Sequence, residues 1–156
     1  MIIDSSLQFD PAGTAITATA VSTNVLDMGA DGDTGIGTDL KVTVLPQATF
    51  TAAGGATLQI QLEGAPDNGS GAPGTYDVYA QTEALSISQL NAGTVQGISL
   101  TGFDLPERVL GDVPPRFYRL NYIVATGPFT AGTVQAFMNL SRDQLPFYKS
   151  GFSVPN

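Results

Sequence analysis

The stretch RFYRLNY, residues 116–122, concentrates side chains that can bind a ligand or a partner. It places Arg116, Phe117, Tyr118, Arg119 and Tyr122 within seven residues of one another. Guanidinium groups pair with carboxylates and phosphates, and aromatic rings offer flat apolar faces. The stretch therefore predicts either a binding surface or a wall of the fold, depending on which side chains point outward.

A second candidate is the acidic segment DMGADGDTGIGTD at residues 27–39. It contains four carboxylates, those of Asp27, Asp31, Asp33 and Asp39. Loops rich in oxygen ligands bind Ca²⁺, but counted from Asp27 the third position is Gly29 and the closing glutamate is replaced by Thr38. A solvated turn is the favoured interpretation, with calcium as the alternative, and no metal or cofactor is predicted.

Catalytic chemistry has little support in the residue types. The chain has no cysteine and no histidine, which removes thiolate metal sites, a cysteine nucleophile and the commonest general base. A glycosidase pair would have to come from isolated carboxylates such as Asp104, Glu107, Asp112 and Asp143. The segment GIGTDL lacks the third glycine of a dinucleotide fingerprint, and no helical pattern follows it. We predict that the protein is not an enzyme.

The charge balance and the apolar runs exclude two classes of partner. The net charge is −8, with 14 acidic residues against six basic ones, so the chain would repel a polyphosphate. No apolar run approaches the roughly 18 residues that cross a bilayer, and MIIDSSLQFD lacks the basic and long apolar parts of a signal peptide. We expect no nucleic-acid partner, no membrane partner and no secretion.

The elements that must position these residues are strands. With 18 glycines and 10 prolines the chain is rich in turns, and no stretch keeps a helical apolar spacing for three turns. Strands are expected at 2–9, 15–21, 24–28, 39–45, 57–63, 76–80, 83–88, 95–100, 116–124 and 133–140. The turn DPAG would follow the first strand, and Pro46 would end the fourth. The pattern predicts an all-β fold: a single antiparallel β-sandwich, jelly-roll-like, over residues 1–156, with 141–156 as an extended C-terminal tail.

Two segments bear on where a binding face would lie. In 57–63 the apolar Leu58, Ile60 and Leu62 alternate with polar residues, which predicts one buried face and one wet face. The segment GAPDNGSGAPG, residues 64–74, cannot hold a core and is expected to be a long exposed loop or a partly mobile tip.

Alternation divides the opening stretch into two faces. Tyr118, Leu120 and Tyr122 share the face expected to be core, and the strand 133–140 is expected to pair with this one as a hairpin. The other face would expose apolar, arginine and amide side chains, a mixture enriched at protein interfaces. The interface candidates are Phe117, Arg119, Asn121 and Phe137. The alternative is that the chain covers both faces itself, with Arg119 satisfied by an internal carboxylate.

The order of short motifs resembles one known family. IIDSSLQFDPAGTAITATAVSTNVLDMG, GIGTDLKVTV, RFYRLNYIV and AGTVQAFM together are similar to the capsid cement, or decoration, proteins of tailed phages, specifically the family of the cement protein from a short-tailed Bordetella phage. The resemblance covers residues 2–138 and brings no catalytic residue with it.

The resemblance implies a jelly-roll-like protein on the outer surface of an icosahedral phage head, made in the cytoplasm of the bacterial host. Its partners would be the major capsid protein and itself, as a homodimer or alternatively a trimer. The competing hypothesis is a virion or extracellular module that binds carbohydrate or a receptor through the loops at 29–38 and 64–74.

Overall fold

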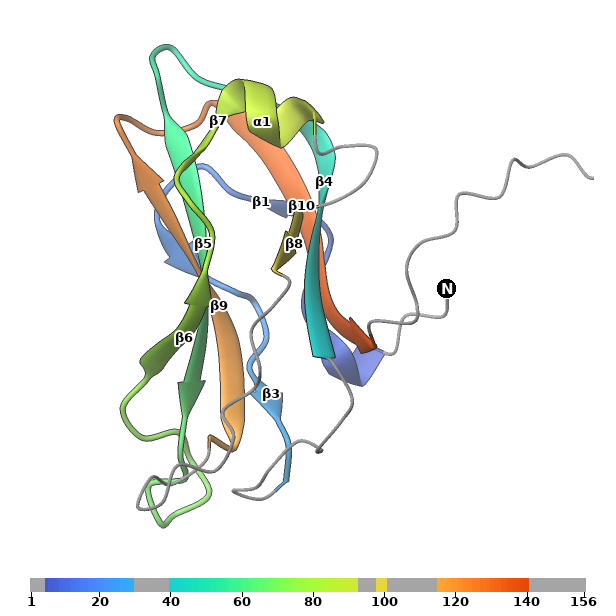
Figure 1. The fold of residues 1–156 in the computed structure, drawn as a ribbon, viewed down its shortest axis with the longest axis vertical. Helices are drawn as coiled ribbons and strands as arrows, with labels where there is room; N and C mark the ends of the chain where they lie inside the picture. The colour runs from blue at the N-terminus through green and yellow to red at the C-terminus, as the bar shows by residue number, and fades with distance from the viewer. Residues whose placement is uncertain (1–4, 30–39, 93–97, 101–114, 141–156) are drawn as a thin grey trace, which may run out of the picture.

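The computed structural model describes residues 5–29, 40–92, 98–100 and 115–140, and they form two facing β-sheets (Figure 1). A 3-10 turn, Ser5–Leu7, precedes the first strand, and one short helix, α1, spans Ile87–Ala92. The strands are β1 Gln8–Ala15, β2 Ala20–Val21, β3 Leu26–Asp27, β4 Leu40–Thr51, β5 Thr57–Ala65, β6 Asp77–Gln81, β7 Leu85–Ser86, β8 Ile98–Leu100, β9 Phe117–Ala125 and β10 Ala131–Leu140. No helix in these ranges is long and apolar enough to cross a membrane.

The strand order confirms the all-β sandwich and is that of a jelly roll. One sheet has the order β1-β10-β4-β8, and the other has the order β2-β9-β5-β6. In the second sheet β3 also pairs with β9, and β7 also pairs with β5. Every pair is antiparallel. Along the eight strands of these two orders, each strand is followed by one in the other sheet, except that β5 and β6 are neighbours in the same sheet, as in a jelly roll.

The predicted hairpin between the two last strands is wrong. β9 pairs with β5, β2 and β3, whereas β10 pairs with β1 and β4, so the two strands lie in opposite sheets (Figure 1). Both carry one apolar face, and packing these two faces against each other buries more apolar surface than pairing the strands edge to edge. The intervening loop therefore crosses between the layers.

Several predicted strand boundaries also need correction, because bulges carry strands through expected breaks. DPAG lies inside β1, where the register with β10 shifts around Gly13, at a φ of 89°. Pro46 lies inside β4, next to a register shift, where a missing N–H is tolerated. Of the expected strand 2–9, residues 2–4 lie outside the described residues, 5–7 form the 3-10 turn, and only 8 and 9 belong to β1. Of 15–21, only Ala15 in β1 and the two residues of β2 lie in strands.

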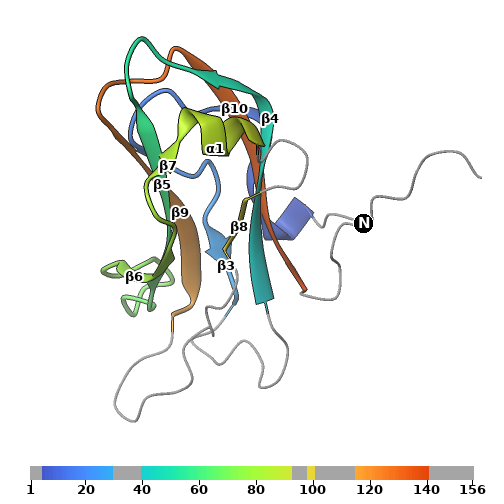
Figure 2. The ribbon, with the colours of Figure 1, turned by 45° about the horizontal axis from the view of Figure 1, so that its top comes forward.

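The helix α1 was missed: the expected strand 83–88 is a strand only at Leu85–Ser86, which is β7, and α1 begins at Ile87. Ser86 and Gln89 form a capping box, in which Ser86 N donates to Oε1 of Gln89 at 2.9 Å and Gln89 N faces Oγ of Ser86 at 3.4 Å. Asn91, near the end of α1, pairs with both backbone groups of Phe50 at 2.8 and 3.1 Å. The side-chain amide of Asn91 thus bonds to the backbone of β4 as a neighbouring strand would. The helix α1 lies beside that strand at one end of the sandwich (Figure 2).

The core lies between the sheets and confirms the predicted inward face. Tyr118, Leu120 and Tyr122 from β9 are buried there, opposite residues of β4 and β10. The other large buried members include Phe9, Phe50, Leu58, Ile60, Leu62, Leu90 and Phe129. One continuous core joins both sheets within the described part of the chain.

Candidate interaction surface

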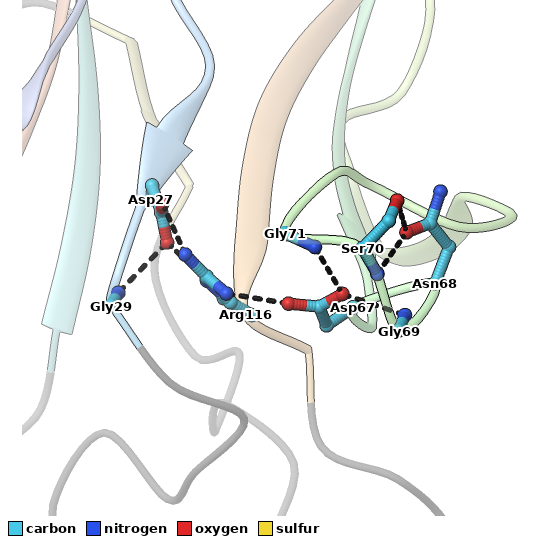
Figure 3. Close-up of polar contacts among 8 residues, drawn as sticks. All are labelled: Asp27, Gly29, Asp67, Asn68, Gly69, Ser70, Gly71 and Arg116. Atoms are coloured by element: carbon cyan, nitrogen blue, oxygen red, sulfur yellow. Dashed lines mark hydrogen bonds and ion pairs between the residues drawn. The ribbon is translucent and has the colours of Figure 1, made fainter.

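Arg116 holds together three separate parts of one end of the molecule. Its Nε and Nη2 donate to the two carboxylate oxygens of Asp27 at 2.6 and 2.8 Å, and Nη1 donates to Oδ2 of Asp67 at 2.5 Å (Figure 3). Asp27 ends β3, Asp67 follows β5, and Arg116 precedes β9. We call this group the Arg116 clamp. The planar guanidinium suits it because one side can pair bidentately while another N–H reaches a second carboxylate.

The electrostatics of the Arg116 clamp follow from these bonds. Hydrogen bonds from Arg116 lower the pKa of Asp27, with help from the amide of Gly29. The amide of Gly71 is the main cause of the lowered pKa of Asp67, and Gly69 and Arg116 add to it. The pKa of Arg116 is raised by its bonds to Asp27. All three groups therefore stay charged at neutral pH.

The segment 66–74, here called the tip loop, is tied to the Arg116 clamp through Asp67 and closed by its own hydrogen bonds. Oδ1 of Asp67 accepts from the amides of Gly69 at 2.7 Å and Gly71 at 3.0 Å (Figure 3). Backbone bonds from Asn68 to Ala72 and from Gly74 to Pro66 close the base of the loop. The exposed loop was expected over 64–74, but Gly64 and Ala65 belong to β5 and are buried. In 66–74, side-chain carboxylate and amide groups satisfy backbone donors where a core does not. The tip loop lies at the opposite end of the sandwich from α1 (Figure 1).

A row of polar side chains crosses the outer face of the second sheet from β6 to β9. Arg119 donates from Nε to Glu63 at 2.7 Å, and Asn121 donates to the other oxygen of Glu63 at 2.9 Å. Gln61 joins the row through Gln81 at 2.8 Å. The guanidinium of Arg119 also lies 3.7 Å from the centre of the Tyr76 ring, in cation–π geometry. We call these residues, Gln61, Glu63, Tyr76, Gln81, Arg119 and Asn121, the polar ladder.

Register explains why the polar ladder forms. Glu63 lies directly opposite Arg119, and Gln61 lies directly opposite Asn121, in the β5–β9 pair. The predicted wet face of β5 is only partly wet, because Glu63 is 7% exposed. Its charge is tolerated there because Arg119 and Asn121 engage both of its oxygens.

Two of the four interface candidates are buried, which corrects the expectation that they would be exposed. Phe137 is 1% exposed, since β10 is a central strand and Phe137 is flanked by Gln8 on β1 and Thr43 on β4. Phe117 is 5% exposed and lies beside Ala65, with the guanidinium of Arg116 4.9 Å from its ring centre. Arg119 and Asn121 remain partly exposed on the polar ladder. Arg119 is paired with an internal carboxylate, as the alternative interpretation expected.

One buried polar cluster has no counterpart among the sequence predictions. Asp10 is 1% exposed, and its Oδ2 accepts the hydroxyl of Tyr122 at 2.7 Å. Its Oδ1 accepts the amide and the hydroxyl of Thr23, both at 2.8 Å. Burial raises the pKa of Tyr122, and the charge of Asp10 raises it further, so the phenol stays a donor. The sequence analysis had placed Asp10 in the turn DPAG, and residue type alone does not identify its partners.

The proposed calcium ligands and acidic pairs are not assembled in the described residues. Asp27 is engaged by Arg116, and Asp31, Asp33 and Asp39 lie outside the described residues. The described ranges contain no group of three or more side chains suited to a metal ion. Asp104, Glu107, Asp112 and Asp143 also lie outside them. Among the described residues, the buried carboxylates are Asp10 and Glu63, and they have separate partners.

The chemistry available here is recognition through hydrogen bonds and charge. In the described part of the chain, every buried side-chain nitrogen and oxygen has a partner. In the polar ladder and the tip loop, partly exposed side chains are also hydrogen-bonded to one another, which arranges their donors and acceptors in one pattern.

Comparison with known proteins gives one family. The chain matches the family model Bbp16 over residues 11–138, a span that runs from within β1 to within β10. No curated protein matches the chain.

Proposed function

The chain belongs to the Bbp16 family, and from this premise we propose that it is a structural virion protein that cements the head of a tailed phage. Bbp16 is the name of a Bordetella phage protein. In the proposed role the protein binds the outside of the icosahedral shell and bridges neighbouring major capsid subunits. The family match across most of the chain is the observation that carries the proposal.

The mechanism would be mass action. A protein that binds the assembled shell but not its separated subunits stabilises the shell by its binding free energy. Many copies act together, each through a contact of about 1,600 Å² or less. A rigid two-layer domain suits this role, because a flexible one would lose part of the binding free energy on ordering.

The polar ladder and the tip loop are the surfaces that we propose for these contacts. Both combine partly exposed polar groups with internal hydrogen bonds, so they offer a fixed pattern of donors and acceptors. Self-association as a homodimer is part of the proposal, because two-fold assembly is the commonest closed symmetry. The acidic net charge fits an outer location better than one in contact with packaged DNA.

The test is reconstitution on heads that lack this protein. Purified protein should bind expanded heads and raise the temperature at which they release DNA or break. Heads incubated with an unrelated acidic β-protein are the control. Binding that leaves the stability of the head unchanged would contradict cementing and leave a passive decoration.

The ordered tip loop also supports a second candidate, a module that binds carbohydrate or a receptor. Its exposed amide and hydroxyl groups, from Asn68 and Ser70, are held in fixed positions. A glycan array, run with and without Ca²⁺, tests this candidate. Binding to a defined glycan would favour it over cementing, and a blank array would remove it.

A further inference from the structure

Asn68 and Gly69 form the one Asn-Gly step in the sequence, and the structure places it on the exposed tip loop. We propose that this step is a site of spontaneous deamidation in the folded protein, and that the tip loop supplies groups that assist the reaction. The inference does not depend on the proposed function.

The reaction needs only the chain and water. The backbone nitrogen of Gly69 attacks Cγ of Asn68, a new N–C bond forms, and the bond from Cγ to the side-chain nitrogen breaks. Ammonia leaves, carrying the proton that Gly69 N has lost. Water then opens the resulting cyclic imide at either carbonyl, which gives aspartate or isoaspartate at position 68.

Ser70 holds the carbonyl that would be attacked. Oδ1 of Asn68 accepts from Ser70 N at 2.9 Å and from Ser70 Oγ at 2.6 Å (Figure 3). Two donors on one carbonyl oxygen polarise its carbon and stabilise the negative charge that develops on oxygen during attack. The same two bonds hold the Asn68 side chain over its own following backbone.

Asp67 accepts a hydrogen bond from the Gly69 amide, whose proton must be removed in the attack. The amide of Gly69 donates to Oδ1 of Asp67 at 2.7 Å, which is within the reach required of a proton acceptor (Figure 3). Gly69 itself has a φ of 88°, and apart from its chain neighbours no atom lies within 4 Å of where a Cβ would stand, so the space beside its Cα is open. The attacking nitrogen, the carbonyl and a carboxylate acceptor thus lie within three consecutive residues.

The modification would change the tip loop that carries it. Aspartate adds a negative charge next to Asp67, and isoaspartate adds a carbon to the main chain between positions 68 and 69. The longer main chain would displace Ser70 from its bonds and disturb the backbone bond from Asn68 to Ala72. The loop that Arg116 now holds through Asp67 would then loosen.

The experiment follows the intact folded protein over time at neutral and mildly alkaline pH. Peptide mapping by mass spectrometry measures conversion at each asparagine, and isoaspartate methyltransferase labels the isomerised product. We expect conversion at Asn68 well before Asn24, Asn91 or Asn121, which are followed by larger residues. An Asn68 that persists in the folded chain while it converts in urea would overturn the proposal.

Variants separate assistance by the tip loop from the reactivity of any Asn-Gly step. Ser70→Ala removes one of the two donors to Asn68 and should slow conversion severalfold, and Asp67→Asn should slow it as well. Asp27→Asn is the matched control, because it removes a carboxylate from Arg116 without touching the bonds of Asn68 or Gly69. Faster conversion in Ser70→Ala would show that these bonds protect Asn68 and would overturn the assisting role.

Discussion

The hydroxyl of Tyr122 on β9 donates to the buried carboxylate of Asp10 on β1 at 2.7 Å, which joins the two sheets through the interior. Because Asp10 is also held by Thr23, this cluster fixes the N-terminal crossing between the layers. A buried carboxylate needs all of its donors, so the cluster is a sensitive point of the fold.

Tyr122→Phe should therefore lower the free energy of unfolding by about 1–3 kcal/mol, because it leaves one oxygen of Asp10 without its donor. Thermal or denaturant unfolding measures the loss. Tyr76→Phe is the matched control, since the ring of Tyr76 rather than its hydroxyl meets Arg119. Equal stability of Tyr122→Phe and the parent protein would contradict the importance of the bond.

Tyr122 also predicts a dependence of stability on alkaline pH. Its pKa in the folded chain is raised above the ordinary value of 10.0, first by burial and then by Asp10. A raised pKa means that the unfolded chain loses its proton first, so this stability is complete below pH 10.0 and declines as the pH rises beyond it. The decline in unfolding free energy should be shallower in Tyr122→Phe.

Replacing Phe137 should lower the free energy of unfolding more than replacing Arg119. The side chain of Phe137 is 1% exposed, so Phe137→Ala leaves a buried cavity. It should destabilise the fold by about 3–5 kcal/mol. Arg119→Met leaves buried Glu63 with one fewer donor and should cost about 1–2 kcal/mol, because solvent reaches partly exposed Arg119 and screens part of the pair.

Measurements of binding distinguish a contact role for Arg119 from a role in stability alone. If the polar ladder contacts a partner, Arg119→Met should weaken association with heads or with itself beyond its effect on unfolding, as sedimentation and head binding would measure. An Arg119→Met protein that binds as well as the parent would remove the polar ladder as the contact.

Gly132→Ala should be strongly destabilising, because a Cβ there would overlap the ring of Phe50 in the core. We expect a loss of about 1–3 kcal/mol from overpacking, in addition to the strain of a φ of 145°. Gly127→Ala is the control, since Gly127 has a φ of 107° with open space around it. Similar losses in the two variants would show that backbone strain alone matters.

Arg116→Lys should loosen the tip loop, because an ammonium cannot reproduce the bidentate pair with Asp27 while also reaching Asp67. Hydrogen exchange at the amides of Gly69 and Gly71 should become faster, while exchange in β9 and β10 stays unchanged. Unaltered exchange at both glycines would mean that Asp67 holds the loop without Arg116.

The Arg116 clamp should respond to acid as well. The pKa values of Asp27 and Asp67 are lowered in the folded chain, so the stabilisation is complete above the unfolded value of 3.8 and is lost as the pH falls below it. Arg116→Lys should show a smaller acid-dependent change in tip-loop exchange than the parent protein.

Much of the β-architecture could be predicted from alternation. The inward face of β9 and of β5 followed from the two-residue period, because a strand puts alternate side chains on opposite faces wherever it pairs. The β5 strand itself lies close to its expected bounds. The helix α1 carried a readable signal in Ser86 and Gln89, but its length of six residues is too short for an apolar period to appear.

The candidate site could be predicted only in part. The alternation identified Arg119 and Asn121 as outward-facing, and it also placed Phe117 and Phe137 there. It could not show that the two aromatics would be covered, since coverage depends on which strands lie alongside. Arg116 was noted in the opening stretch, but its two partners are 89 and 49 positions away in the sequence.

The sequence by itself determined the strands β5 and β9, their inward faces and the absence of cysteine and histidine chemistry, because these follow from residue type and local period. Only the tertiary structure decided that β9 and β10 lie in opposite sheets, that Asp10 meets Tyr122, and that Arg116 orders the tip loop through Asp67. These relations join residues far apart in the chain. They are set by which apolar faces pack together, and local sequence does not specify that choice.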